Sequence, residues 1–282
     1  MIKLQLGKYL PASVLWAGIC FWRKKFMRKR FFAYAMLYVL LATVALSGCQ
    51  INLPPWKKLA GRGEIITLEN SLSGDKYSLV ITDIQFTASN TGAIEIDEDL
   101  SDKFTLSTYQ NIADTITVTV DDEVGTIHLK GNKKYRYSTD DFKIQVGVPL
   151  GSVEIDGGFT LDLKLPSVTD FTLKINGAIS GDLAFDQLDT LTVQINGASN
   201  IALTGDCEQC TVSINGASDI DAADFRTQDS AITINGAGSY TVNATGTLDA
   251  YVNGVGTITY IGEPEKINDR IVGLGTIKQQ GE

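Results

Sequence analysis

A four-residue phrase recurs at nearly constant spacing through the second half of the chain. It consists of a branched apolar residue, then Asn-Gly, then a small or branched residue. Five close copies begin at Ile175, Ile195, Ile214, Ile234 and Val252, and weaker copies begin at Ile155 and Ile271. The glycines stand at positions 157, 177, 197, 216, 236, 254 and 273, so successive copies are 18 to 20 residues apart. A fixed period of this length indicates a repeat architecture in which each unit packs on the preceding one.

The residues before each Asn-Gly pair alternate between apolar and polar. Val193 and Ile195, for example, alternate with Thr192 and Gln194. This period of two is typical of strands, and the abundance of Thr, Val, Ile and Gly disfavours a helical repeat. A strand, an Asn-Gly corner and a second short strand in about 20 residues describe one coil of a β-helix. The sequence therefore predicts an all-β, parallel β-helix-like solenoid.

The Asn-Gly pair allows a second interpretation, because it is also the commonest signal for a tight hairpin. A hairpin should show similar alternation on both sides, whereas here the clean alternation lies only before the pair. A corner between stacked coils fits better, since Gly and Asn tolerate positive φ. Equivalent amides would then lie about 4.8 Å apart and could bond in a ladder. The residues predicted to form this ladder are Asn176, Asn196, Asn215, Asn235 and Asn253.

The start of the chain has the features of an export signal. Residues 1–48 contain eight Lys or Arg and no acid, and Phe31–Leu46 is apolar. The ending Leu46-Ser47-Gly48-Cys49 resembles a bacterial lipobox, which implies cleavage before Cys49 and attachment of a lipid to its thiol. The alternative is an uncleaved membrane anchor with a free cysteine. Met27 directly precedes the basic run and is a candidate for the true start. Residues 49–62 would form the lipidated N-terminus and tether.

Charge limits the partners of the remainder of the chain. The whole chain has 24 basic and 33 acidic residues, so residues 49–282 carry 16 against 33, a formal charge of −17. Such a balance disfavours nucleic acid. It equally disfavours attachment to anionic lipid by charge, so we expect the lipid on Cys49 to hold the protein at the membrane. The expected location is the bacterial cell envelope, either periplasmic or at the cell surface.

Two regions follow the tether. Residues 63–150 show alternating strands without the repeated phrase, and we expect them to begin the stack and to cap its N-terminal end. Residues 151–278 form the repetitive part. Capping is required because an open end of stacked strands exposes unpaired backbone groups.

The sequence provides little reactive chemistry. Its one histidine, His128, lies in an alternating strand, and no hydrolase, metalloprotease or phosphate-binding motif is present. Acids such as Asp219, Asp221 and Asp224 are best explained as solubilising loop residues, so no catalytic residue, metal site or cofactor is expected. Cys207 and Cys210 form either a structural disulfide within one coil or two free thiols.

These pieces together resemble the auto-transporter adhesin head GIN domain family over about residues 80–278. The matching parts are Phe104–Leu106, Ile116–Val120, Gly125–Leu129, Ile144–Pro149, the Ile-Asn-Gly-Ala series, Tyr260–Pro264 and Gly273–Gly275. The resemblance implies a right-handed β-helix-like fold in exported bacterial proteins and supplies no active site.

The function that we expect is a lipid-anchored extracytoplasmic β-helix, an adhesin or surface-binding scaffold without catalysis. Its ligand would be a glycan or a protein. Two alternatives stay open: an envelope structural or stress lipoprotein without a dedicated ligand, and a polysaccharide-active β-helix enzyme.

Overall fold

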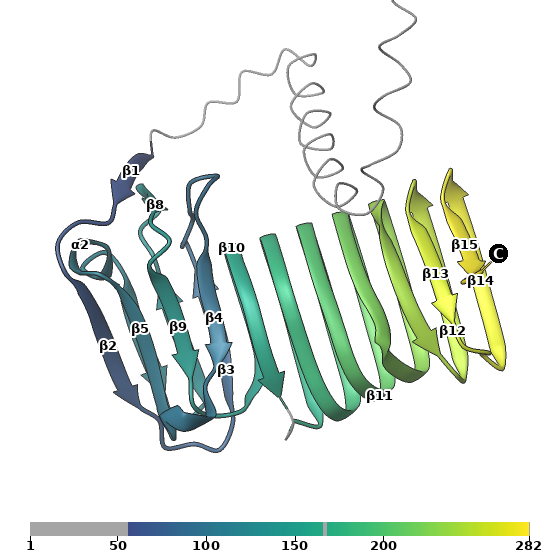
Figure 1. Ribbon diagram of the computed structural model, residues 1–282, viewed down its shortest axis with the longest axis horizontal. Helices are drawn as coiled ribbons and strands as arrows, with labels where there is room; N and C mark the ends of the chain where they lie inside the picture. The colour runs from purple at the N-terminus through teal and green to yellow at the C-terminus, as the bar shows by residue number, and fades with distance from the viewer. Residues whose placement is uncertain (1–55, 166–167, 282) are drawn as a thin grey trace, which may run out of the picture. The chain divides into compact units, whose positions relative to one another are not determined.

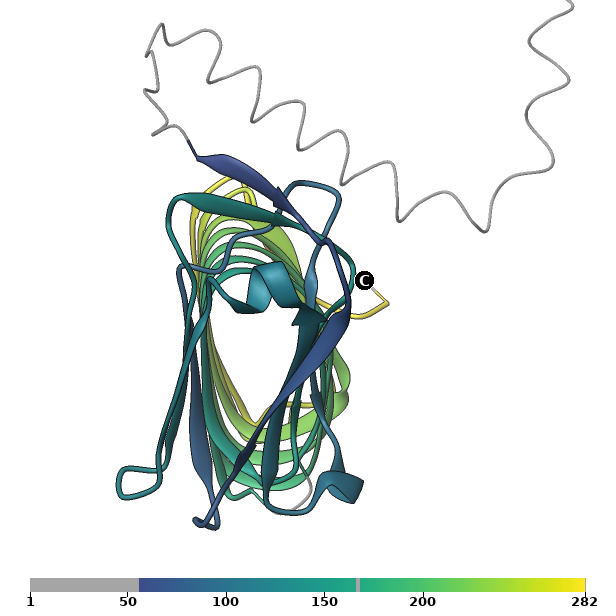
Figure 2. The same cartoon turned by 90° about the vertical axis from the view of Figure 1, so that its left-hand side faces the viewer.

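The protein is an all-β chain whose main sheet closes nearly on itself like a barrel (Figure 2). The computed structural model describes residues 56–165 and 168–281, so the predicted export segment and Cys49 lie outside the described residues. Residues 55–282 form one compact unit. Among the described residues, no helix has the length and apolar character needed to cross a bilayer.

Strands are the dominant element of this unit, which has little helix (Figure 1). In chain order the elements are β1 (Lys57–Ala60), β2 (Ile65–Ser71), β3 (Tyr77–Thr82), β4 (Gly92–Ile96), the 3-10 turn η1 (Glu98–Leu100), β5 (Lys103–Tyr109), α2 (Gln110–Ala113), β6 (Thr117–Asp121), β7 (Thr126–Lys130), β8 (Tyr135–Ser138), β9 (Phe142–Val146), β10 (Leu150–Leu165), β11 (Asp170–Ala244), β12 (Thr247–Gly254), β13 (Thr257–Ile261), β14 (Lys266–Gly273) and β15 (Thr276–Gln279).

The repeated region consists of successive parallel turns. Ile155 of β10 pairs with Ile175 of β11, so each pairing joins residues about one sequence period apart. The same relation continues from β11 to β12 and from β12 to β14, where Val252 pairs with Ile271. β11 is a single extended segment of 75 residues that follows the wall through several turns (Figure 1). The strands flanking Asn-Gly therefore pair with neighbouring turns, and the hairpin interpretation does not apply.

Parallel register places equivalent apolar residues in columns inside the wall. One column contains Ile155, Ile175, Ile195, Ile214, Ile234 and Val252, and each side chain is fully buried. Every such side chain contributes about 1.5–3 kcal/mol relative to an exposed position. The hydrophobic core is thus a continuous set of columns, and the alternation in the sequence fixes which residues enter it.

The N-terminal end of the sheet is built differently. β2 and β5 pair in antiparallel fashion, as do β5 and β9, while β9 joins the parallel region through β4. The one-turn helix α2 lies across the end of the barrel-like wall (Figure 2), and its Ile112 and Ala113 are buried. Sequence periodicity gave no sign of this helix because it is only four residues long.

The C-terminal end interrupts the columns. Ile271 stands in register with Val252 of the isoleucine column, yet its side chain is 41% exposed. No described strand pairs with β14 beyond β12, so nothing covers that side of Ile271. The neighbouring column of Ile232 and Ala250 ends in Asp269. An inward-facing charge at an unpaired strand is a known device against edge-to-edge pairing.

The corner glycines are required by the close contact between successive turns. Gly197 has φ +148°, a backbone region that is essentially restricted to glycine. A Cβ at this position would lie 1.9 Å from the carbonyl oxygen of Gly177, which belongs to rigid stacked backbone. Gly158 differs, because its Cβ would lie 3.6 Å from the nearest heavy atom, the Ala178 oxygen. Only the first position must be glycine.

We therefore expect Gly197→Ala to lower the free energy of unfolding by about 2–4 kcal/mol, through backbone strain and a forced shift between turns. The control is Gly158→Ala, which adds the same methyl group where there is room and should change stability by less than about 0.5 kcal/mol. Urea denaturation followed by circular dichroism measures both variants. Equal stability of the two would contradict the stacking explanation.

Candidate ligand-binding groove at the asparagine corner

The corner asparagines form a chain of side-chain hydrogen bonds along the outside of the wall. The amide nitrogen Nδ2 of Asn196 donates to Oδ1 of Asn176 at 2.9 Å, and that of Asn215 donates to Asn196 at 3.0 Å. Asn235 donates to Asn215 at 3.0 Å and Asn253 to Asn235 at 3.4 Å. The structure thus brings together all five asparagines named from the sequence.

The ladder has a direction and ends on a carboxylate. Every amide donates toward the N-terminal side, and the last donor, Asn176, gives its hydrogen bond to Oδ1 of Asp156 at 2.8 Å. Asp156 occupies the ladder position in the weaker first copy of the repeat. Aligned amides polarise one another, so the positive ends of their dipoles point at this carboxylate. Asp156 is therefore the terminal acceptor of the ladder.

The asparagine side chains of the ladder lie at the protein surface and are not a buried network. Asn215 is exposed to solvent, so the desolvation cost of an unpaired buried amide does not arise. Each exposed amide hydrogen bond is then worth the ordinary net value of about 0.5–1.5 kcal/mol.

We expect Asn215→Ala to lower the free energy of unfolding by about 1–2 kcal/mol, because it removes one donated and one accepted hydrogen bond. Asn200→Ala is the matched control, since Asn200 is exposed but lies outside the ladder. Thermal melting of both variants provides the measurement. A loss that is no larger for Asn215→Ala than for the control would mean that the ladder adds nothing to stability.

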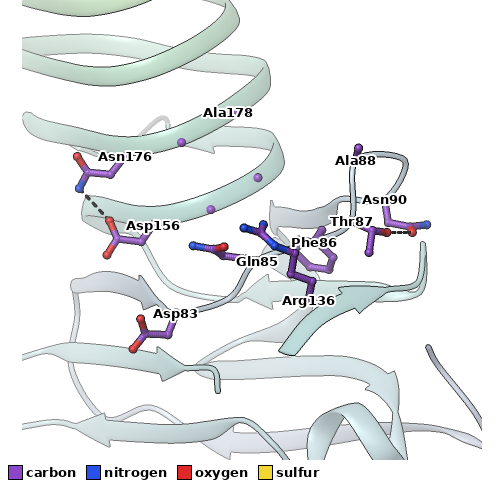
Figure 3. A pocket seen from close by; sticks show the side chains of 13 residues that line it. Asp83, Gln85, Phe86, Thr87, Ala88, Asn90, Arg136, Asp156, Asn176 and Ala178 are labelled. Carbon is purple, nitrogen blue, oxygen red and sulfur yellow. Dashed lines mark hydrogen bonds between the residues drawn. The ribbon is translucent and has the colours of Figure 1, made fainter. Parts of the chain in front are cut away.

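A polar hollow of about 590 Å³ lies beside the start of the ladder (Figure 3). One wall comes from the loop between β3 and β4, a second from β8, and the third from the first corners of β10 and β11. Its lining includes Asp83, Gln85, Phe86, Thr87, Ala88, Asn90, Arg136, Asp156, Gly157, Gly158, Asn176, Gly177 and Ala178. We call this hollow the corner groove.

Specific contacts hold the loop wall in place. Asp83 has φ +61°, an uncommon conformation for a residue other than glycine. The Asn90 side chain donates to Asp140 at 2.7 Å and accepts from Ser138 at 3.1 Å. Phe86 is buried and packs edge-on against Phe142 and Phe159, whose ring centroids are 5.2 and 5.4 Å away. The polar side chains that face the groove therefore stand on a loop anchored to the core.

The groove combines hydrogen-bonding groups of several kinds. Asp83 and Asp156 supply carboxylates, Gln85 and Asn176 supply amides, and Arg136 supplies a guanidinium. Figure 3 shows the Arg136 and Gln85 side chains lying between the loop and the corner. Such a mixture of donors and acceptors fits a polar, hydroxyl-rich ligand. Within the described residues, no group of His, Cys, Asp and Glu could hold a metal ion.

A second hollow of about 410 Å³ lies around Arg226 and is lined by Gln187, Asp206, Cys207, Glu208, Thr227, Gln228, Thr245, Gly246 and Glu265. It is smaller, and the three acids around one arginine leave it more negative. We regard the corner groove as the better candidate site.

The two cysteines of the repeat are free and buried. Of the two interpretations that the sequence allowed, the structure has the pair of thiols and no disulfide. Burial raises the pKa of Cys207 to about 11 and that of Cys210 to about 12. Both thiols are thus protonated at neutral pH, which is the state of structural cysteines, since the thiolate is the reactive form.

The other candidate residues have structural partners. Nε2 of His128 is 2.9 Å from the Thr82 hydroxyl, across the register pair of β3 and β7. Asp219 accepts from the backbone nitrogen and hydroxyl of Ser239, and Asp221 accepts from the Ala223 nitrogen. These acids bind their own chain and do not form a shared carboxylate site.

Comparison with known proteins identifies the family of this chain. The family model described as putative auto-transporter adhesin, head GIN domain, matches residues 84–264. The chain belongs to this family. The match begins in the loop that forms the groove wall and ends beyond the asparagine ladder, so both features lie within the head GIN domain. No functionally curated protein matches the chain.

Solved structures share the fold. A putative adhesin from Bacteroides fragilis is 23% identical, with a TM-score of 0.66 over 78% of this chain and 99% of its own. Putative adhesins from Parabacteroides merdae and Parabacteroides distasonis are 18% and 17% identical, with TM-scores of 0.52 and 0.53. Each alignment covers 79% of this chain, and 98% and 100% of those proteins. At this identity the likeness concerns the fold alone.

Sequence reasoning identified the ladder asparagines but missed the groove. Gln85 and Arg136 are far apart in the chain and follow no shared motif. One local signal was available, because Asp156 replaces asparagine in the first copy of the repeat. That substitution marks the end of the ladder nearest the groove.

Proposed function

We propose that this protein is a lipid-anchored protein of the bacterial cell envelope that binds a glycan at the corner groove and performs no catalysis. The corner groove is the observation that supports the proposal. It presents carboxylate, amide and guanidinium groups on a rigid wall, which is the chemistry that recognises sugar hydroxyls. Membership in the head GIN domain family agrees with surface binding, since the family and the solved relative from Bacteroides fragilis are described as putative adhesins.

The absence of catalysis is inferred from the groups that line the groove. Asp83 and Asp156 are the two carboxylates there, and both have other partners. Asp83 forms an ion pair with Lys133 at 3.6 Å, while Asp156 accepts the end of the amide ladder. A glycosidase needs one carboxyl group held protonated as a general acid. Both carboxylates of the groove are instead engaged in contacts within the chain.

We further propose that the parallel turns wind as a right-handed β-helix with about 20 residues per coil over residues 151–278, with residues 63–150 capping its start. The offset of each register pair supports the coil length. Right-handedness is the general rule for a parallel strand connection within one sheet. The rigid stack would keep the walls of the groove in a fixed position relative to one another.

The anchor itself is proposed from the sequence. Residues 1–48 would direct export, Cys49 would carry the lipid, and residues 49–62 would link it to the β region. Two or three acyl chains give stable attachment, since each buried CH2 contributes about 0.8 kcal/mol.

We expect the full chain to bind a defined set of oligosaccharides on a glycan array without cleaving them. For any oligosaccharide that binds, Gln85→Ala should weaken binding about two- to tenfold, because one hydrogen bond to the ligand is lost. Gln194→Ala is the control, since Gln194 is an exposed amide outside both hollows. Release of shorter sugars would instead identify an enzyme. The absence of any binding would favour a structural envelope lipoprotein.

Cys49→Ser tests the anchor. We expect the variant expressed in a bacterial host to lose lipid labelling and to move from the membrane fraction to the soluble fraction, because no acyl chain can be attached. Incorporation of a radiolabelled or alkyne-tagged fatty acid measures the first outcome, and fractionation measures the second. Continued membrane association of the variant would show that an uncleaved apolar segment is the anchor.

A further inference from the structure

The first described strand forms a separate ribbon with β8. β1 and β8 make a two-stranded parallel sheet, in which Lys57 pairs with Tyr135 and Lys58 with Arg136 (Figure 1). The backbone nitrogen of Lys57 also donates to the carbonyl oxygen of Lys134 at 2.7 Å. Leu59 packs against the core, and its register partner Tyr137 is buried within it. Strand alternation places Lys57 on the same face as Leu59, at the exposed end of the strand, whereas Lys58 and its register partner Arg136 lie on the opposite, outward face.

The ribbon concentrates positive charge that the sequence distributes between two distant segments. Residues 56–60 and 132–138 contain five basic residues and no acid, namely Lys57, Lys58, Lys133, Lys134 and Arg136. The four lysines are exposed. Residues 49–282 hold 16 basic and 33 acidic residues, so removing these five leaves 11 against 33, a charge of −22 elsewhere. The net charge of the chain therefore does not describe the local charge of this ribbon.

One lysine of the ribbon forms an ion pair with an acid. Lys133 pairs with Asp83 at 3.6 Å, but the lysine side chain is 80% exposed and the carboxylate is 22% exposed. This geometry gives a weak ion pair, so the ammonium group stays accessible to an outside anion.

An aromatic residue completes the outward face. Trp56 is 41% exposed, and the Arg136 guanidinium lies 4.9 Å from the centre of its ring. An exposed Trp among cations is typical of a surface that meets the headgroup region of a bilayer, where the indole finds both apolar and polar surroundings. Charge alone would equally suit other polyanions, but this Trp favours a lipid surface.

The position of the ribbon in the chain indicates which surface it meets. Seven residue steps separate Cys49 from Trp56, a distance of at most about 25 Å when fully extended. On the anchoring proposed above, on which this inference rests, the ribbon is the part of the described structure that begins nearest the bilayer. The strongly negative remainder is repelled by anionic lipid, so the charge asymmetry orients the molecule with the ribbon toward the membrane.

We propose that the β1–β8 ribbon is a membrane-docking surface whose occupant is the anionic phospholipid headgroups of the bilayer that carries the anchor. Lys57, Lys58, Lys133 and Lys134 neutralise headgroup phosphates, and Trp56 inserts at the interface. Docking places the corner groove, which shares Arg136 with the ribbon, close to the membrane surface.

Hydrogen exchange on the full chain tests this proposal. The protein is reconstituted into vesicles of phosphatidylcholine alone or mixed with phosphatidylglycerol. A two-stranded ribbon is marginally stable by itself, so its amides report docking directly. Because each cation near an anionic surface contributes roughly a fivefold factor in binding, amides of β1 and β8 should exchange at least about fivefold more slowly on the anionic vesicles. The difference should disappear in high salt, which screens the attraction.

Matched variants decide between docking and general electrostatics. Replacing Lys57, Lys58, Lys133 and Lys134 with Gln should abolish the slowing, while Arg136 is kept. The control variant replaces Lys164, Lys174, Lys266 and Lys278 with Gln. These lysines are exposed elsewhere on the protein, so the change in net charge is the same, but the slowing of exchange should remain. Circular dichroism verifies that both variants are folded.

Three results would overturn the proposal. These are equal exchange on the two kinds of vesicle, equal loss in the control variant, and the same slowing produced by inorganic phosphate on neutral vesicles. Failure of lipid attachment would not be mistaken for failure of docking. Flotation of the vesicles first verifies that the protein is attached to them, and exchange is compared only for attached protein.

Discussion

The direct stacking of one corner upon the next is the contact on which the rest of this structure depends. At Gly197 a backbone carbonyl of the preceding turn occupies the space where a side chain would begin. This approach fixes the parallel register, and the register aligns the apolar columns inside and the amides outside. Because the turns are locked together by backbone, a local change at one corner affects the alignment of both faces of the wall.

A stack of strands leaves unpaired backbone groups at each end, and the two ends of this structure differ in how they limit further pairing. At the N-terminal end the register changes from parallel to antiparallel, and α2 buries Ile112 across the opening. At the C-terminal end the apolar column that includes Ile232 finishes in Asp269, and Ile271 is left partly exposed. A charge at the last inward position opposes pairing with another strand at little structural cost, since no described turn lies beyond it to be disrupted.

The groove and the ribbon arise where the repeated region meets the irregular one. The ladder delivers a line of aligned amides to Asp156, while the loop anchored by Phe86 forms the facing wall. Arg136 belongs to both features, because it lines the groove and lies over the Trp56 ring. A periodic wall offers the same chemistry at every turn. A distinct site therefore appears only where the period is broken.

The amino-acid sequence by itself determined the all-β class, the length of the period, the residues that enter the core and the asparagines that stand over one another. These follow from signals local to each copy, because strand alternation and the needs of a tight corner act over a few residues. Only the tertiary structure decided the N-terminal capping by α2, the groove and the basic ribbon. Each requires contact between segments that are not adjacent in the chain. The strands β1 and β8, for example, meet across more than seventy residues, and no spacing in the chain encodes that contact. The overall charge even suggested the opposite of the ribbon, because an average over the chain hides cations that folding gathers on one face.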